Sequence, residues 1–186
     1  MSLASHPPAT LVAGRIGVLG RPTAPPVVRG VRLRTLPAGH LDHLLAVFDG
    51  LSPHSRYQRY HQAMVRLTSR MRSALLDVEP GRHEVIGATQ RRRPVGIARW
   101  IRDRRDPGRA ELAVEVVDAA QGRGIGRALI TAAARSARKA GIDEFDCYPH
   151  PANPWLTTLG GRPDGEEPGA WRVSVDGLAA PLRGLR

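Results

Sequence analysis

The pattern of apolar and polar residues changes period along the chain, and each period predicts a different kind of element. Over residues 31–36 apolar and polar residues alternate, as in a β-strand with one buried face. Over about residues 40–50 the apolar positions recur at helical spacing, which predicts a helix. Ser52 and Pro53 then form a typical helix start, and residues 54–78 are expected to form one or two further helices.

Beyond residue 80 short apolar runs replace the helical pattern. Two of these runs flank an arginine-rich turn at residues 91–94 and predict a β-hairpin. An alanine-rich amphipathic helix is expected over residues 124–140, with Gly141 at its C-terminal end. The expected strands of this half cover residues 84–88, 95–101, 110–117, 142–148 and 170–175. Strands that cluster with few interposed helices predict an α+β domain with a mixed sheet.

The first 30 residues differ from the rest of the chain in composition. They are rich in proline, alanine and glycine, so residues 1–30 are expected to form a flexible arm before one domain over residues 31–186. The sequence shows neither a signal-peptide pattern nor an apolar stretch of membrane-spanning length, which predicts a cytoplasmic protein. The single cysteine, Cys147, excludes an intramolecular disulfide and a cysteine zinc site, and we expect it to be a small buried residue.

The formal net charge of +11 comes almost wholly from arginine, because Lys139 is the one lysine among 28 basic residues. Such a charge suits an anionic ligand or partner. Nucleic acid is not expected, since the arginines are scattered along the chain and aromatic residues make up only 4% of it. A small ligand with several phosphates is an equally good partner for this charge.

The most informative segment joins an expected strand to an expected helix. Its residues are Gln121, Gly122, Arg123, Gly124, Ile125, Gly126 and Arg127. Glycines allow the backbone to approach a phosphate, and free N–H groups at a helix start attract its charge. Glycine spacing alone leaves a dinucleotide-binding turn open, but that turn belongs in an early βαβ unit, whereas this segment follows a hairpin. A P-loop is excluded, because no Gly-Lys-Ser/Thr closes the segment.

This segment resembles the coenzyme A-binding signature of the GNAT acetyltransferase superfamily, Gln/Arg-x-x-Gly-x-Gly/Ala, with Gln121, Gly124 and Gly126 at the fixed positions. Residues 51–60 and 110–113 are similar to the GNAT domain of bacterial protein-lysine acetyltransferases of the Pat type. The resemblance implies a GNAT-like, mostly antiparallel central sheet flanked by helices. It also implies an N-acetyltransferase that takes acetyl-coenzyme A (acetyl-CoA) as cosubstrate and uses no metal. The acceptor would be a protein lysine or a small primary amine, which attacks directly in a ternary complex.

The resemblance implies roles for residues near the glycine-rich turn. The backbone of Val116 and Val117 is expected to hold the pantetheine arm and acetyl group, and residues 121–127 the pyrophosphate. An amine attacks a thioester only when neutral, so a base must first remove a proton. Glu111 matches the glutamate that the Pat-type subgroup carries on this strand and is the expected base. Glu115 shares its face of the strand and is the alternative.

The region after the expected alanine-rich helix, residues 124–140, departs from the superfamily pattern. The last helix of the superfamily often starts at an asparagine, here Asn153, which is expected to contact coenzyme A. That helix also carries a tyrosine that protonates the thiolate, but here it is short and has none, so Tyr148 is the nearest candidate acid and water is the alternative. These departures leave open a second function, a coenzyme A-binding regulatory domain with weak or no turnover. His40 and His43, on one helix face, are interpreted as a solvated or capping pair.

Overall fold

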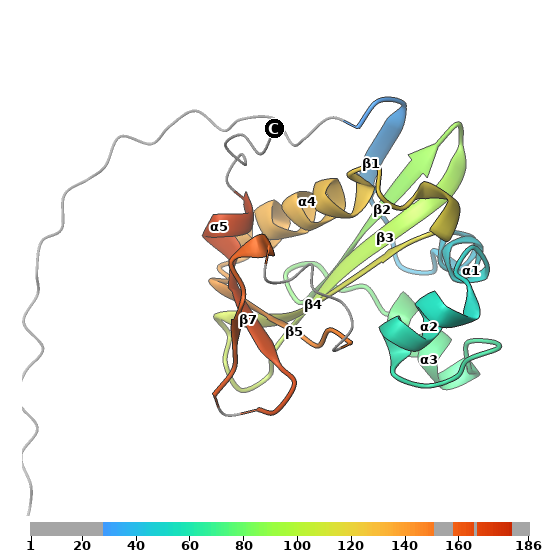
Figure 1. Cartoon of the computed structure of the whole chain (residues 1–186). Coiled ribbons are helices and arrows are strands. Elements are labelled where there is room, and N and C mark those ends of the chain that lie inside the picture. Colours follow the sequence, from blue (N-terminus) through green and yellow to red (C-terminus); the bar gives the residue numbers. More distant parts are fainter. Residues whose placement is uncertain (1–27, 151–157, 166, 180–186) are drawn as a thin grey trace, which may run out of the picture.

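The computed structural model describes residues 28–150, 158–165 and 167–179, and Figure 1 shows how their elements are arranged. Most of the expected N-terminal arm and Asn153 lie outside the described residues. Among the helices that are described, none is long and apolar enough to cross a membrane. The domain boundaries therefore stay a prediction, and the described part allows the sheet, the core and the candidate site to be followed.

Within the described residues, seven strands form one sheet in the order β1-β2-β3-β4-β5-β7-β6. The strands are β1 (Val31–Thr35), β2 (His83–Gln90), β3 (Arg93–Arg102), β4 (Arg109–Val116), β5 (Glu144–Cys147), β6 (Arg162–Pro163) and β7 (Trp171–Ser174). Neighbouring strands run antiparallel except for β4 and β5, which are parallel. The predicted α+β class with a mixed, mostly antiparallel sheet is confirmed.

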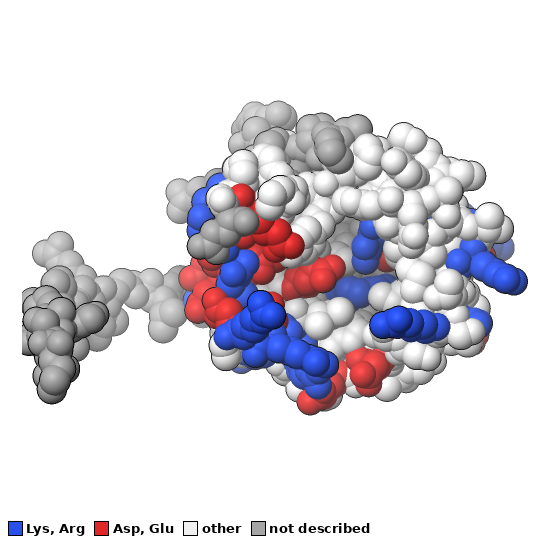
Figure 2. Space-filling model, turned by 90° about the horizontal axis from the view of Figure 1, so that it is seen from below, with Lys and Arg blue, Asp and Glu red and all other residues white. Residues whose placement is uncertain are grey.

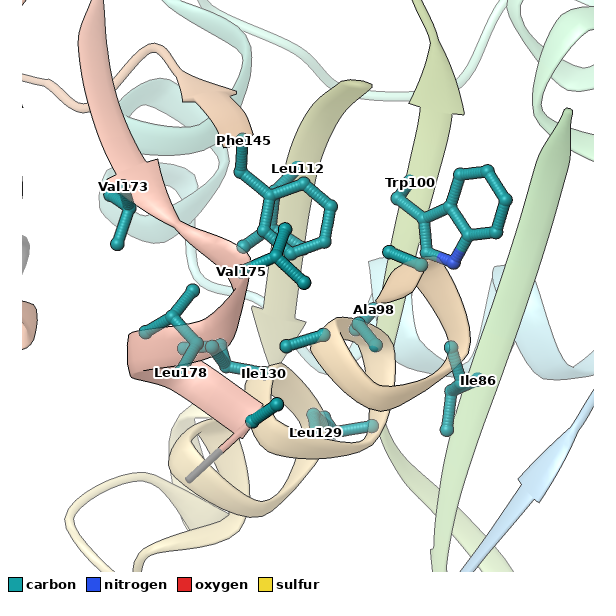
Figure 3. Packing of buried hydrophobic residues seen from close by; sticks show 14 of the residues in the cluster. Ile86, Ala98, Trp100, Leu112, Leu129, Ile130, Phe145, Val173, Val175 and Leu178 are labelled. Atoms are coloured by element: carbon teal, nitrogen blue, oxygen red, sulfur yellow. The ribbon is translucent and has the colours of Figure 1, made fainter. Parts of the chain in front are cut away.

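Helices cover both faces of the sheet (Figure 1). They are α1 (Leu41–Asp49), α2 (Pro53–Tyr60), α3 (Ser69–Leu76), the 3₁₀ turn η1 (Asp118–Ala120), α4 (Ile125–Lys139) and α5 (Val175–Ala179). On one face, α4 packs against the sheet, and its Leu129 and Ile130 belong to the same buried cluster as Trp100 and Leu112 of the strands (Figure 3). On the other face, α1 belongs to a separate apolar cluster. Side chains along each strand point alternately into these two cores, because successive residues of a strand face opposite sides of the sheet.

Several local features extend or correct the predicted elements. The hairpin turn consists of Arg91 and Arg92 alone, both with positive φ (49° and 66°), so β2 and β3 are longer than predicted. The predicted cap at Ser52 is confirmed, because its side chain accepts a hydrogen bond from the Ser55 N–H. Strand β6 and helix α5 were not predicted, since elements of two and five residues carry no readable periodicity.

The interpretation of His40 and His43 as a solvated or capping pair is wrong, and His40, at the N-cap position of α1, makes no side-chain cap hydrogen bond. Both are buried, and the His43 Nε2–H donates to the Gly96 carbonyl at 3.0 Å. Gly87 makes room for this ring, because a Cβ there would lie 2.6 Å from His43 Cε1. The imidazole takes a core position of α1, where the backbone of β3 satisfies its Nε2, whereas its Nδ1 is buried without a partner among the described residues.

Candidate active site

A cleft opens where β4 and β5 part. The two strands pair only over Arg109–Glu111 and Glu144–Asp146, so beyond this point the described residues offer β4 no strand partner on that side. The cleft that results has a volume of about 820 Å³, within the range of small-molecule sites. It is lined by β4, the end of β5, α2 and the start of α4. Figure 2 shows this part of the surface hollowed, with acidic and basic side chains gathered around it.

The start of α4 forms one end of the cleft and presents unpaired backbone donors. Gly122 and Gly124 have φ values of 69° and 79°, a conformation that favours glycine. Gly124 is the N-cap residue and provides no side-chain cap, and the Ala128 N–H makes the first bond of the helix, to the Gly124 carbonyl. The N–H groups of the first turn therefore lack a helical acceptor and, with the helix dipole, suit an anion.

Gln121 fixes the turn that leads into α4. Its side-chain amide donates to the Val116 carbonyl at 3.0 Å and to Asp118 Oδ1 at 3.2 Å. These bonds join the end of β4 to the glycine-rich turn, so Gln121 orients the backbone donors. Val116 lines the cleft, whereas the Val117 N–H already donates to the Val95 carbonyl at 3.1 Å.

The two arginines of the turn lie differently. Arg127 lines the cleft and is half-buried, and its Nε is buried without a hydrogen-bond partner among the described residues. Arg123 is exposed and is not part of the lining. A phosphate at the helix start would give the Arg127 guanidinium the charge-assisted partner that it lacks here.

Glu115, the alternative base, is buried in a network of ion pairs. Its carboxylate is 3.2 Å from Arg59 Nε and 3.7 Å from Arg99 Nη2, and it accepts a hydrogen bond from the Tyr60 hydroxyl at 3.3 Å. Only 4% of the residue is exposed. Burial, and after it the Glu115 charge, raises the pKa of Tyr60, so the phenol stays protonated and keeps donating. A carboxylate that accepts two hydrogen bonds and pairs with two guanidinium groups is poorly placed to accept a proton from a substrate.

Glu111, four residues earlier on the same face of β4, has the opposite surroundings. It is exposed and makes no hydrogen bond or ion pair within the described part of the chain. It lines the cleft and also an adjoining hollow of about 380 Å³, as does Tyr148. Glu111 and Tyr148 therefore stand between two hollows, where a molecule in one can meet a molecule in the other.

Tyr148 follows β5 and faces this meeting point. Its hydroxyl donates to Glu167 Oε2 at 3.0 Å. Burial and this hydrogen bond raise the pKa of Tyr148 to about 12, so the phenol is protonated at neutral pH. Its neighbour Cys147 is buried, and burial raises the pKa of that thiol to about 12. The Cys147 thiol is therefore protonated and a poor nucleophile, although it lines the cleft.

The structure also brings residues to the cleft that were not anticipated. His61 ends α2 in the left-handed conformation, and its Nε2–H donates to the Tyr148 carbonyl at 3.1 Å. The His61 and His150 rings lie 6.1 Å apart, and Tyr57 packs against His150. These contacts tie the end of α2 to the segment after β5 across the cleft. No sequence signal marks them, because the partners are almost 90 residues apart.

Comparison with known proteins places this geometry in a family. A model of the acetyltransferase (GNAT) family matches residues 45–155. The GNAT domain of S. lividans PAT is 24% identical, with a TM-score of 0.69 over 77% of this chain and 89% of that one. The PaiA N-acetyltransferase from Thermoplasma acidophilum, solved in complex with coenzyme A, is 16% identical, with a TM-score of 0.58 over 77% of this chain and 98% of that one.

A third similar structure is a larger protein. The cAMP-binding acyltransferase from Mycobacterium smegmatis, as its E234A mutant, is 25% identical, with a TM-score of 0.55. The alignment covers 78% of this chain and 44% of that one, so the chain spans less than half of that protein. The shared part is the fold described above. With the family match over more than half of the sequence, the chain belongs to the GNAT family of acetyltransferases and is an acyltransferase.

Proposed function

We propose that this chain is an N-acetyltransferase that transfers the acetyl group of acetyl-CoA to a primary amine, on a small molecule or a protein lysine. The observation that carries the proposal is the cleft between β4 and β5, with unpaired helix donors at one end and the free Glu111 carboxylate at the other. A ligand with an anionic end and a reactive end fits such a cleft. Membership of the GNAT family supports the identification of this ligand as acetyl-CoA.

Coenzyme A is expected to lie along β4. The first turn of α4 and Arg127 would hold its pyrophosphate. Backbone groups at the open edge of β4 would hold the pantetheine arm. Since the Val117 N–H is bonded to β3 and strand groups alternate between the two edges, Val116 and Val114 are better placed for this than Val117. Asn153, another expected contact, lies outside the described residues.

Glu111 is the better candidate for the base. The acceptor arrives as an ammonium ion, and Glu111 would take one proton from it, directly or through a water. The neutral nitrogen then forms a bond to the thioester carbonyl carbon, the carbon–sulfur bond breaks, and the nitrogen, positively charged after attack, passes its extra proton to water or to the group that protonates the thiolate, which leaves a neutral amide. The leaving thiolate needs a proton, which the protonated Tyr148 hydroxyl or water would supply. Tyr148 must first break its hydrogen bond to Glu167, so water remains the alternative proton donor to the thiolate.

Thiol release across a panel of primary amines tests this function. We expect coenzyme A to be released at a rate that depends on the amine, together with an equal amount of acetylated amine. Tight coenzyme A binding with no amine-dependent release would instead support the regulatory domain. That alternative still rests on the departures after β5, and the free Glu111 carboxylate argues against it.

A further inference from the structure

The acceptor side of the cleft contains an unequal set of charges. Glu115 contacts two guanidinium groups, those of Arg59 and Arg99. Arg59 lies on α2 and lines the cleft, whereas Arg99 lies on β3 behind Glu115. Two positive charges and one negative charge leave an excess positive charge at this wall of the cleft. An excess charge in a partly buried site attracts a ligand group of the opposite sign.

The guanidinium group of Arg59 brings this excess charge, together with hydrogen-bond donors, to the lining of the cleft. Its Nε bonds to Glu115, and its guanidinium carbon lies 5.0 Å from the centre of the Tyr60 ring. Its two terminal nitrogens make no hydrogen bond within the described residues, and its side chain is 24% exposed. A guanidinium fixed at Nε, with both terminal nitrogens open, matches the two oxygens of a carboxylate.

Arg99 raises the positive potential at this point. It is 2% exposed, and none of its three side-chain nitrogens has a hydrogen-bond partner in the described part of the chain. Glu115, at 3.7 Å, is its nearest carboxylate and is shared with Arg59. A buried guanidinium that is only half neutralised and screened little by solvent adds its field to that of Arg59.

The negative charge of Glu111 lies at the other end of the same face of β4. Glu111 and Glu115 are four residues apart on β4, so their Cα atoms lie roughly 13 Å from each other at the usual rise of a strand. Glu111 is free to meet an ammonium group, and Arg59 to meet a carboxylate. Because side chains reach inward from both ends, the gap suits an amine and a carboxylate separated by several bonds.

We propose that Arg59, supported by Arg99, forms a carboxylate-binding subsite, so that the preferred acceptor is a primary amine that also carries a carboxylate several bonds away. This inference rests on the proposed function for the placement of the amine. The carboxylate can belong to a free amino acid such as lysine or to an acidic side chain next to a lysine in a peptide. Both sources offer the same chemistry to Arg59.

The test compares two acceptors that differ only in charge at one end, 6-aminohexanoate and 6-aminohexanamide. For the wild-type protein saturated with coenzyme A, calorimetry should show the acid binding about tenfold more tightly than the amide, as one retained ion pair would give. Thiol release from acetyl-CoA should show the same preference in KM. Lysine peptides with glutamate or glutamine beside the lysine form a second arm, which identifies the source of the carboxylate.

Arg59→Gln should abolish the preference by weakening binding of the acid while binding of the amide stays within about twofold. Arg59→Lys should restore part of the preference, because lysine supplies the positive charge but not the paired N–H donors of a planar guanidinium group. Arg70→Gln removes a charge from the exposed part of α3 and should leave the preference intact. Circular dichroism of each variant checks that the fold is kept.

Equal binding of the acid and the amide by the wild-type protein would overturn the subsite, as would a preference that survives Arg59→Gln. The proposed function fails on a different result, namely no amine-dependent thiol release with any acceptor. Since the binding measurement requires no turnover, the two failures are distinguishable.

Discussion

At the scale of single residues, two glutamates on one strand face have different tasks. Glu115 is buried between two arginines and a tyrosine, and Glu111 is exposed and has no partner among the residues that the structure describes. The sequence predicted that both lie on one face of the strand, and the resemblance to the Pat-type subgroup alone ranked Glu111 before Glu115. Which glutamate is free to act as the base depends on Arg59, Tyr60 and Arg99, which reach Glu115 from a helix and a neighbouring strand.

Glu115→Gln should destabilise the protein, because it leaves Arg99 as an uncompensated buried charge. We expect a loss of about 3 kcal/mol in the free energy of unfolding, measured by urea denaturation. Glu111→Gln is the matched control and should change this free energy by less than about 0.5 kcal/mol, since Glu111 is exposed and makes no ion pair in the described part of the chain. Equal stability of the two variants would contradict the structural role of Glu115.

Cys147 should take no covalent part in the reaction. Burial raises the pKa of its thiol to about 12, so thiolate is scarce at neutral pH. Cys147→Ala should therefore retain turnover to within about tenfold, the loss arising from packing beside the cleft. Intact-protein mass spectra after mixing with acetyl-CoA should show no acetyl group on Cys147, and a stoichiometric acetyl-cysteine would refute direct attack.

At the scale of elements, the glycine-rich turn and α4 act as one anion-binding unit. The turn was readable from the sequence because its glycines, its glutamine and the flanking elements are contiguous. The role of Gln121 was not, since its bonds to the Val116 carbonyl and to Asp118 depend on how η1 folds back. The bridge from His61 to Tyr148 was equally unreadable, because it joins α2 to the end of β5.

Gly124→Ala should weaken coenzyme A binding beyond its effect on stability. Gly141 offers a matched control, because it has a similar φ (77° against 79°) at the other end of α4. A Cβ at either position meets no atom closer than 3.9 Å, so each substitution should cost roughly 1–2 kcal/mol of backbone strain. Calorimetric titration with coenzyme A should show weaker binding for Gly124→Ala alone. Equal affinities would remove the turn from the binding site.

At the scale of the whole molecule, family, fold class and the order of the main elements followed from the sequence, because long amphipathic elements and contiguous motifs dominate the pattern. The polar part of the core did not follow from the sequence. Three histidines, His40, His43 and His83, are buried. Their burial depends on tertiary features such as the space that Gly87 leaves for His43, and no local pattern records these features.

These histidines should make stability depend on pH. Burial lowers the pKa of each, so the folded protein resists protonation where the unfolded chain accepts it. Their contribution is complete above the unfolded pKa of about 6.5 and is lost as the pH falls below it towards the folded pKa. The free energy of unfolding should therefore decrease between about pH 7 and pH 5.5.

Urea denaturation across this range measures the slope. His43→Gln should reduce the slope, whereas the same change at the exposed His54 of α2 should leave it as it is. A free energy of unfolding that does not fall on acidification would contradict the neutral, buried state of the three imidazoles.

The central claim is that the cleft between β4 and β5 transfers an acetyl group with Glu111 as the base. The most direct measurement is steady-state turnover of Glu111→Gln beside its dissociation constant for coenzyme A. We predict a fall in kcat of about a hundredfold or more, the usual contribution of general base catalysis, with coenzyme A affinity unchanged. Undiminished turnover in this variant would contradict the assignment of Glu111.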